Sequence, residues 1–180
     1  MNIKSEIKKN KILSESEKNL INNNRIKEFG KESIIDFKRD YEPNTEWFFV
    51  KENNKIVALG CLRPIIIDYL NKKHKIMGIC SIISIEKGKG YGRKLIESMI
   101  DYLKKKGKTG LGFTNQTEFF KKAGLKTERD FIKRFVYKDS ATKKETIDNE
   151  GDGIYYEGKE DFIKKVLSTQ SMVFIEIIHW

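Results

Sequence analysis

One segment of the chain, Ser81 to Ile100 (SIISIEKGKGYGRKLIESMI), constrains its fold more than any other. A run of β-branched residues ends at a loop rich in lysine and glycine, and an apolar pattern of helical period follows at once. This pattern predicts a helix whose apolar face consists of Leu95, Ile96, Met99, Ile100 and Leu103. A strand, a tight loop and an amphipathic helix in direct succession predict an α/β or α+β domain built on one central sheet.

The loop, Glu86–Gly92, is called the glycine loop below, and its composition favours an anion. Glycines let the backbone approach a ligand closely, and the first N–H groups of the following helix have no partner inside that helix. Both features suit a phosphate group, and Lys87, Lys89 and Arg93 add full positive charges. The ATP-type P-loop lacks its Lys-Ser/Thr pair here, and Lys87 breaks the dinucleotide fingerprint. A tight turn whose lysines only face solvent is the simpler alternative.

The flanking segments predict the other elements. Ser14 and Glu17 have the spacing of a capping box, so a helix is expected to begin there and to end at Gly30. The expected elements before the loop are then a short helix over Glu32–Tyr41, a strand from Glu46, a hairpin turn at Asn53 and Asn54, a second strand that Pro64 places at an edge or a bulge, and a strand over Ile76–Ile85. Those after it are a helix ending at Gly107, a strand in TGLGFT, a short helix ending at Gly124, an alternating strand in DFIKRFVYK, a polar loop or linker over 139–153, a helix near Asp161–Leu167 and a strand near Met172–Ile178.

Composition narrows the class of protein. With 38% hydrophobic and 34% charged residues the chain suits a soluble globular protein. The net charge of +10 comes from lysines spread along the whole chain, so a solvated surface is favoured over nucleic-acid binding. No apolar run reaches membrane-span length, and the N-terminus lacks the apolar centre of a signal peptide. Cys61 and Cys80 lie in strand-like runs, which favours reduced core residues and a cytoplasmic location.

The sequence around the glycine loop resembles a known family. SIEKGKGYGRKLIESMI is similar to the coenzyme A loop of the GNAT acetyltransferase superfamily, [QR]-x-x-G-x-[GA], with Lys87, Gly90 and Gly92 at the fixed positions and Lys in place of Gln or Arg. EFFKKAGL resembles a second family segment that ends at Gly124 and Leu125. The likeness covers about residues 12–138, and it implies a mostly antiparallel central sheet with one splayed parallel pair of strands.

The resemblance also implies a domain division and an activity. Residues 1–138 would form the acetyltransferase domain, and residues 139–180 a linker plus a helix–strand extension that packs on the same domain or on a second copy of the chain. The reaction would be N-acetylation of a primary amine, with acetyl-CoA as acyl donor, no metal and an unidentified acceptor. An acyl-CoA-binding module without efficient transfer is the alternative, and a basic nucleic-acid-binding protein is a weaker one.

Site residues follow from the same resemblance. It implies coenzyme A contacts at Cys80, Ser81, Ile82, Lys87, Gly88, Lys89, Gly90, Tyr91, Gly92, Arg93, Asn115 and Phe120. Asn115 could instead cap a helix. Phe120 stands where the family usually has the Tyr that protonates the departing thiolate, so another Tyr or water would serve. The catalytic residues are unknown, and the weak candidates are Glu86, Glu46, Ser84 and Tyr155.

Overall fold

The structure, a computed structural model, describes residues 2–139 and 142–176. The chain forms two compact units, described in turn below: residues up to Arg63 with Ile79–Met99, and Pro64–Gly78 with the residues from Ile100 onward. Three elements pass from one unit into the other: β3 (Lys55–Tyr69), β4 (Lys72–Ser84) and α2 (Tyr91–Lys106). The short 3-10 helices are η1 (Asn10–Ile12), η2 (Lys31–Ser33) and η3 (Phe131–Arg134).

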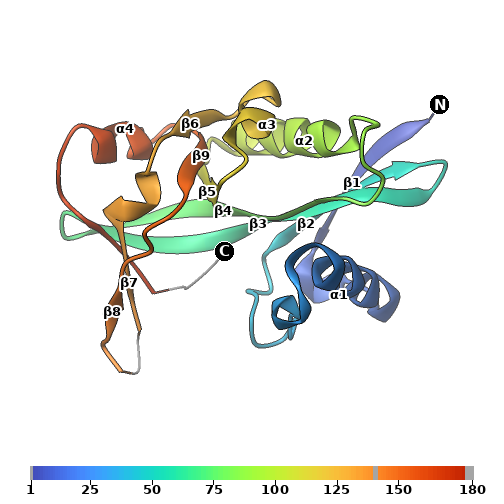
Figure 1. The fold of residues 1–180 in the computed structure, drawn as a ribbon, viewed down its shortest axis with the longest axis horizontal. Coiled ribbons are helices and arrows are strands. Elements are labelled where there is room, and N and C mark those ends of the chain that lie inside the picture. Colours follow the sequence, from blue (N-terminus) through green and yellow to red (C-terminus); the bar gives the residue numbers. More distant parts are fainter. Residues whose placement is uncertain (1, 140–141, 177–180) are drawn as a thin grey trace. The chain divides into compact units, whose positions relative to one another are not determined.

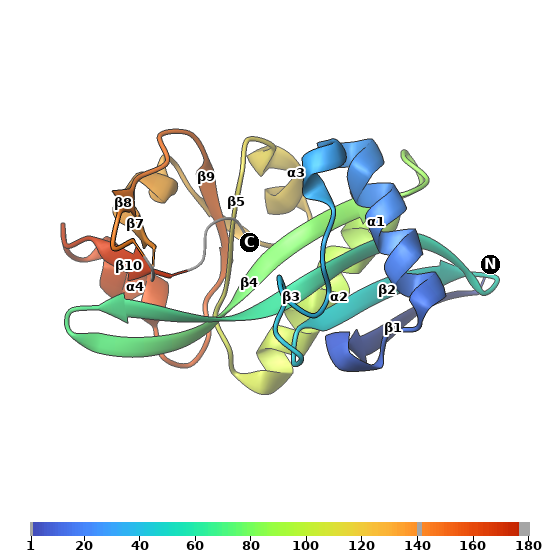
Figure 2. The same ribbon diagram turned by 90° about the horizontal axis from the view of Figure 1, so that it is seen from below.

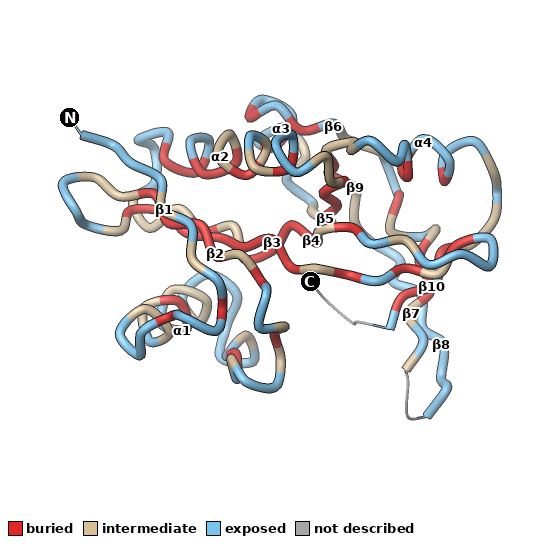
Figure 3. Tube along the Cα trace, turned by 180° about the vertical axis from the view of Figure 1, so that it is seen from behind, coloured by how far each residue is buried: buried red, intermediate tan, exposed pale blue. Residues whose placement is uncertain are grey.

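The first unit is built on a sheet with the strand order β1-β2-β3-β4 (Figure 2). β1 (Ile3–Lys9) pairs antiparallel with β2 (Glu46–Glu52), and β2 pairs antiparallel with β3. Helix α1 (Glu15–Phe29) lies on one face of this sheet, and the first turns of α2 lie on the other (Figure 1). Buried residues gather along β2 and β3 and on one side of α2 (Figure 3).

Helix α1 and the hairpin turn at Asn53 and Asn54 form where the sequence predicts them. Ser14 caps α1 in a reciprocal capping box with Glu17, and the helix ends at Gly30, which has a φ of +91°. The two turn residues between β2 and β3, and the two between β3 and β4, are all left-handed, as a two-residue hairpin requires. Pro64 lies in the part of β3 between its pairing with β2 and its pairing with β10 (Val173–Ile175), which fits the predicted edge position.

The prediction of a helix over Glu32–Tyr41 is wrong. After η2 this segment consists of turns and bends, because side chains take up its backbone groups. Asp40 Oδ2 accepts a hydrogen bond from the N–H of Asp36 at 2.8 Å. Asn22 on α1 holds Ile35 from both sides, accepting from its N–H at 2.9 Å and donating to its carbonyl at 3.0 Å. Local side-chain hydrogen bonds of this kind give the backbone an alternative to a helix.

Strand β1 was not predicted, because it carries little strand signal. Its residues are largely polar, and its apolar residues Ile3 and Ile7 remain exposed. It pairs along its whole length with β2, from Ile3 opposite Glu52 to Lys9 opposite Glu46. Lysines on such a strand are a common way to discourage pairing with other chains.

The second unit has a mixed sheet. Its additional strands are β5 (Gly110–Thr114), β6 (Lys126–Glu128), β7 (Phe135–Lys138), β8 (Glu145–Thr146), β9 (Asp152–Tyr156) and β10, and its helices are α3 (Thr117–Lys122) and α4 (Phe162–Leu167). The strand order is β6-β9-β5-β4-β3-β10-β7-β8. β4 and β5 pair in parallel, as predicted, and so do β10 and β7. The expected α/β class with a mostly antiparallel sheet and a parallel pair of strands is therefore confirmed at β4 and β5, whereas the parallel pairing of β10 with β7 was not expected.

Two predictions in this unit need correction. The alternating strand expected in DFIKRFVYK is half correct, because its first part forms η3 after the left-handed Asp130 and only Phe135–Lys138 is extended. The expected linker over 139–153 contains β8 and the first residues of β9. Part of the strand predicted near Met172–Ile178 is β10, and its last two residues lie outside the described part of the chain.

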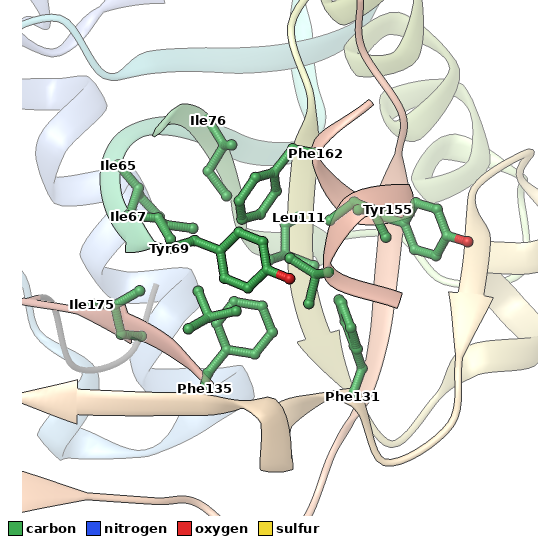
Figure 4. Close-up of a cluster of buried hydrophobic side chains, with 13 residues drawn as sticks. Ile65, Ile67, Tyr69, Ile76, Leu111, Phe131, Phe135, Tyr155, Phe162 and Ile175 are labelled. Carbon is green, nitrogen blue, oxygen red and sulfur yellow. The ribbon is translucent and has the colours of Figure 1, made fainter. Parts of the chain in front are cut away.

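An apolar cluster forms the core of the second unit (Figure 4). It consists of Ile65, Ile67, Tyr69, Ile76, Leu111, Phe131, Phe135, Tyr155, Phe162, Ile163, Val166, Val173 and Ile175. The residues from Tyr155 onward come from β9, α4 and β10. These late elements supply much of the core of this unit.

Candidate active site

Strand β4 bulges at Ser81, which has a φ of +55° in the middle of the strand. The thiol of Cys80 hydrogen-bonds to Cys61 on β3, whereas Ile82 packs over Gly60, the neighbour of Cys61 on the opposite face. Ser81 lies on the same face as Cys80, so two successive side chains point the same way. A bulge of this kind leaves backbone groups outside the regular ladder. These are three of the residues, Cys80–Ile82, for which the family resemblance implies contacts with coenzyme A.

A polar cluster covers the bulge from the side of α1. The guanidinium Nη1 of Arg25 donates to Ser81 Oγ, and the hydroxyl of Tyr41 lies 3.5 Å from the same oxygen. We call Arg25, Tyr41, Cys61, Cys80 and Ser81 the bulge cluster. Burial raises the pKa of the Tyr41 hydroxyl and of the Cys61 thiol well above their ordinary values, so both are neutral near pH 7.

A second arginine lies beside the bulge cluster and is neutralised. Arg63 donates from Nε and Nη2 to the two carboxylate oxygens of Glu42, at 2.7 and 3.1 Å. Its guanidinium also lies over the ring of Tyr41, 4.7 Å from the centroid. A bidentate pair of this kind holds both partners in a fixed geometry.

The glycine loop has the backbone geometry of an anion site. Gly88 and Gly90 have φ values of +80° and +78°, and a Cβ at either position would meet nothing within 4 Å. The loop backbone is therefore open to solvent and not packed against protein. The first hydrogen bond of α2 runs from the N–H of Lys94 to the carbonyl of Gly90 at 3.0 Å, so the N–H groups between these residues precede the helical pattern. The first turn of α2 carries no acidic residue.

Each cation of the loop has an acidic partner at the surface. The amine of Lys87 lies 3.1 Å from Glu28, Lys89 lies 2.8 Å from Glu86, and Arg93 lies 3.0 Å from Glu97. Exposed pairs of this kind contribute little to stability, so exchange for a phosphate costs little. A hollow of about 450 Å³ opens beside the loop, lined by Ile3, Lys89, Gly90, Tyr91, Arg93, Lys94 and Glu97.

Comparisons with known proteins identify the family. Residues 14–124, more than half of the chain, match the acetyltransferase (GNAT) family. The chain belongs to this acetyltransferase family.

Several solved structures share the fold of this chain at low sequence identity. Escherichia coli ElaA has a TM-score of 0.58 and 15% identity, covering 87% of this chain and 100% of its own. The Bacillus subtilis acetyltransferase in complex with CoA has a TM-score of 0.55 and 14% identity, covering 87% and 99%. An N-acetyltransferase from Staphylococcus aureus Mu50 has a TM-score of 0.53 and 16% identity, covering 86% and 97%. Among curated proteins, no sequence match was found.

Within this GNAT chain, Glu86 is a poor candidate for the general base. Hydrogen bonds from Lys55 and then Lys89 lower the pKa of its carboxyl to about 2. A carboxylate that holds a proton so weakly gives little assistance to proton removal near pH 7. Ser84 Oγ donates to the carbonyl of Glu86 at 3.0 Å, and Glu46 is partly buried at the start of β2.

Tyr91 fixes the end of the glycine loop to the β2–β3 hairpin. Its side chain is buried, and its hydroxyl lies beside the carboxylate of Glu52, the last residue of β2. Burial and this carboxylate raise the pKa of Tyr91, which keeps the hydroxyl protonated as a donor. The sequence indicated Tyr91 only as a coenzyme A contact and gave no signal for this anchor.

The other predicted site residues belong to the second unit. Phe120 is buried on α3, with 8% of its surface exposed. Asn115 is exposed, and α3 has Gln116 as its capping residue, so Asn115 does not cap that helix. Tyr155 lies at the rim of the apolar cluster with its hydroxyl directed outward (Figure 4), and burial raises its pKa.

The described residues were also searched for metal sites and for membrane-spanning helices. Among the described residues, no group of three His, Cys, Asp or Glu side chains is arranged to hold a metal ion. Within the same residues, no helix has the length and apolar character needed to cross a membrane.

Proposed function

We propose that this protein transfers the acetyl group of acetyl-CoA to a primary amine in the cytoplasm, and that the glycine loop binds the pyrophosphate of the cofactor. The observation that carries the proposal is the open backbone at Gly88 and Gly90, directly before the N-terminus of α2. Free N–H groups and the helix dipole favour a phosphate there, and Lys87, Lys89 and Arg93 can leave their surface partners to bind it. Cys61 and Cys80 are buried and form no disulfide, which supports the location.

The proposed reaction needs little from the protein beyond positioning. The deprotonated amine attacks the thioester carbonyl carbon, a C–N bond forms, the C–S bond breaks, and coenzyme A leaves as a thiolate that takes up a proton. Backbone groups at the bulge, Cys80–Ile82, would hold the pantetheine so that the thioester meets the amine. A free thiol has a pKa of roughly 8.5, so the thiolate can leave without an acid, though more slowly.

The test combines a binding and a transfer measurement. Calorimetry with coenzyme A should show one site per chain, and ATP or NAD should bind much more weakly. Acetyl-CoA and a panel of primary amines should then release free thiol, with mass spectrometry of the products showing an acetylated amine. Absence of coenzyme A binding would exclude the proposal.

Phe120 favours one second candidate, a module that binds acyl-CoA without efficient transfer. Phe120→Tyr separates the two, because it adds an acid without adding a cofactor contact. General-acid assistance is typically worth about 100-fold or more, so a transferase that lacks its acid should gain turnover with nearly unchanged affinity for acetyl-CoA. Tight binding of coenzyme A with no transfer in either form would support the binding module.

A further inference from the structure

Arg25 differs from the other charged residues beside the bulge because its charge is not neutralised. It is partly buried on α1, and among the described residues it forms no ion pair with a carboxylate. Arg63, on the same face, is fully engaged by Glu42. Burying a charge without a partner is costly, so an unpaired guanidinium at this place requires an explanation.

The guanidinium of Arg25 is also held in one orientation. Its Nε donates to the carbonyl of Ser33 at 2.7 Å, and its Nη1 donates to Ser81 Oγ. The ring of Phe29 lies under the guanidinium carbon, 5.6 Å from the centroid. Both N–H groups of Nη2 are left without an acceptor among the described residues. A planar fork fixed in this way is well suited to binding an anion, because little side-chain entropy is lost on binding.

The neighbours of Arg25 do not cancel its charge. The titratable groups closest to it in the bulge cluster are Tyr41 and Cys61, and burial keeps both neutral near pH 7. Glu28, one turn further along α1, pairs with Lys87 of the glycine loop. None of these groups therefore neutralises the positive charge at the bulge.

We infer that Arg25 binds an anionic group of the acceptor, so that the acceptor is an amine that also carries a carboxylate or a phosphate. The inference rests on the proposed function, because it takes the bulge at Ser81 as the place where the thioester lies. Arg25 contacts Ser81 itself, so an anion on its free N–H groups holds the amine of the same molecule close to the bulge. Arg25 is then a specificity-determining residue that contacts the substrate.

The test uses matched acceptors that differ only in charge. One arm compares amino acids with their carboxamides, and the other compares phosphoethanolamine with ethanolamine, each by thiol release from acetyl-CoA. The unmodified protein should prefer the anionic member of at least one pair by about tenfold or more. The arm that responds identifies the anion as a carboxylate or as a phosphate.

Variants then assign the preference to Arg25. Arg25→Gln should lower kcat/KM for the anionic acceptor by about 10- to 100-fold, mainly through KM, and change that for the neutral partner by less than about threefold. Arg25→Lys keeps the charge without the fork and should fall between the two. Lys27→Gln removes one charge from an exposed position of the same helix and should have little effect.

The outcomes distinguish this inference from the proposed function. Equal use of anionic and neutral amines, or an anion preference that survives in both Arg25 variants, would overturn the role of Arg25 and leave the transferase intact. If no amine causes release of thiol from acetyl-CoA although coenzyme A still binds, both proposals are wrong. Thermal unfolding of each variant shows whether it is folded. If Arg25→Gln does not fold, the result for Arg25→Lys decides whether Arg25 binds the anionic group.

Discussion

Glu86 shows how the environment of one side chain limits the chemistry available to it. Its two lysine partners hold the pKa at about 2, so it carries no proton in any ordinary assay. We expect Glu86→Gln to keep kcat/KM within about threefold, with an unchanged acidic limb of the pH–rate profile, since a general base is worth about 100-fold or more. A loss of that size, together with a vanished acidic limb, would make Glu86 the base after all.

The same depressed pKa has a consequence for stability. Because the folded-state pKa lies below the ordinary value, the ion pairs of Glu86 contribute fully above about pH 5, and their contribution is lost as the pH falls toward 2. Glu86→Gln removes that contribution, so the variant and the unmodified protein should converge in stability at the acidic end. Because the carboxylate is partly exposed to solvent, the effect is expected to be small.

Gly90 allows a test of the cofactor site with a matched control. Gly90→Val places a β-branched residue at a φ of +78° in open space, so the fold should survive with a backbone cost of about 1–3 kcal/mol. Coenzyme A binding should be lost, because the added side chain occupies the space of the phosphate. Gly30→Val imposes similar strain at a φ of +91°, also in open space but at the end of α1, and should leave calorimetric binding unchanged. Equal affinity of the two variants for coenzyme A would show that the cofactor does not bind at the glycine loop.

Among the elements, the junction of the glycine loop with α2 depends on a contact to a hairpin. We expect Tyr91→Phe to weaken coenzyme A binding by about 3- to 10-fold, because loss of the hydroxyl beside the Glu52 carboxylate removes a polar contact that holds the loop to the hairpin. Tyr102→Phe, a hydroxyl deletion further along the same helix, is the control in calorimetry. Unchanged affinity in Tyr91→Phe would show that the loop is positioned by its backbone alone.

Elements with strong local signals could be predicted from the sequence. The capping box at Ser14, the Asn53–Asn54 turn and the glycine loop each specify a backbone shape through their own residues. The segment Glu32–Tyr41 could not be predicted, because Asn22, ten residues or more away in the sequence, takes up its backbone groups. β1 is an exposed edge strand whose pairing depends entirely on β2.

The candidate site divides in the same way. Its cofactor half is a continuous motif, and the sequence was sufficient to propose it. Its acceptor half depends on Arg25, Tyr41 and Ser81, which are brought together only by the placement of α1 and the bulge in β4. Ser81 was expected only as a coenzyme A contact, and neither the spacing nor the type of Arg25 and Tyr41 gave a signal. Tyr41 also lay in a segment expected to be helical.

For the molecule as a whole, the last forty residues decide whether the second unit forms. β9 pairs with both β5 and β6, and β10 lies between β3 and β7, so both strands are interior members of the sheet order. α4 contributes three side chains to the apolar cluster. A chain that ends at Lys138 would expose that cluster and the unpaired edges of the remaining strands, and both promote aggregation.

We therefore expect the chain ending at Lys138 to lose cooperative thermal unfolding and to be recovered mainly as aggregate. Two point variants within the C-terminal segment give the graded form of the test. Phe162 is fully buried in the cluster, so Phe162→Ala should lower the free energy of unfolding by about 3–5 kcal/mol. Phe174 has 37% of its surface exposed on β10, so Phe174→Ala should cost about 1 kcal/mol, close to the average for point variants. Equal and small losses in the two variants, with a soluble and cooperatively folded 1–138 chain, would mean that the segment from residue 139 onward is an accessory to a unit that folds without it.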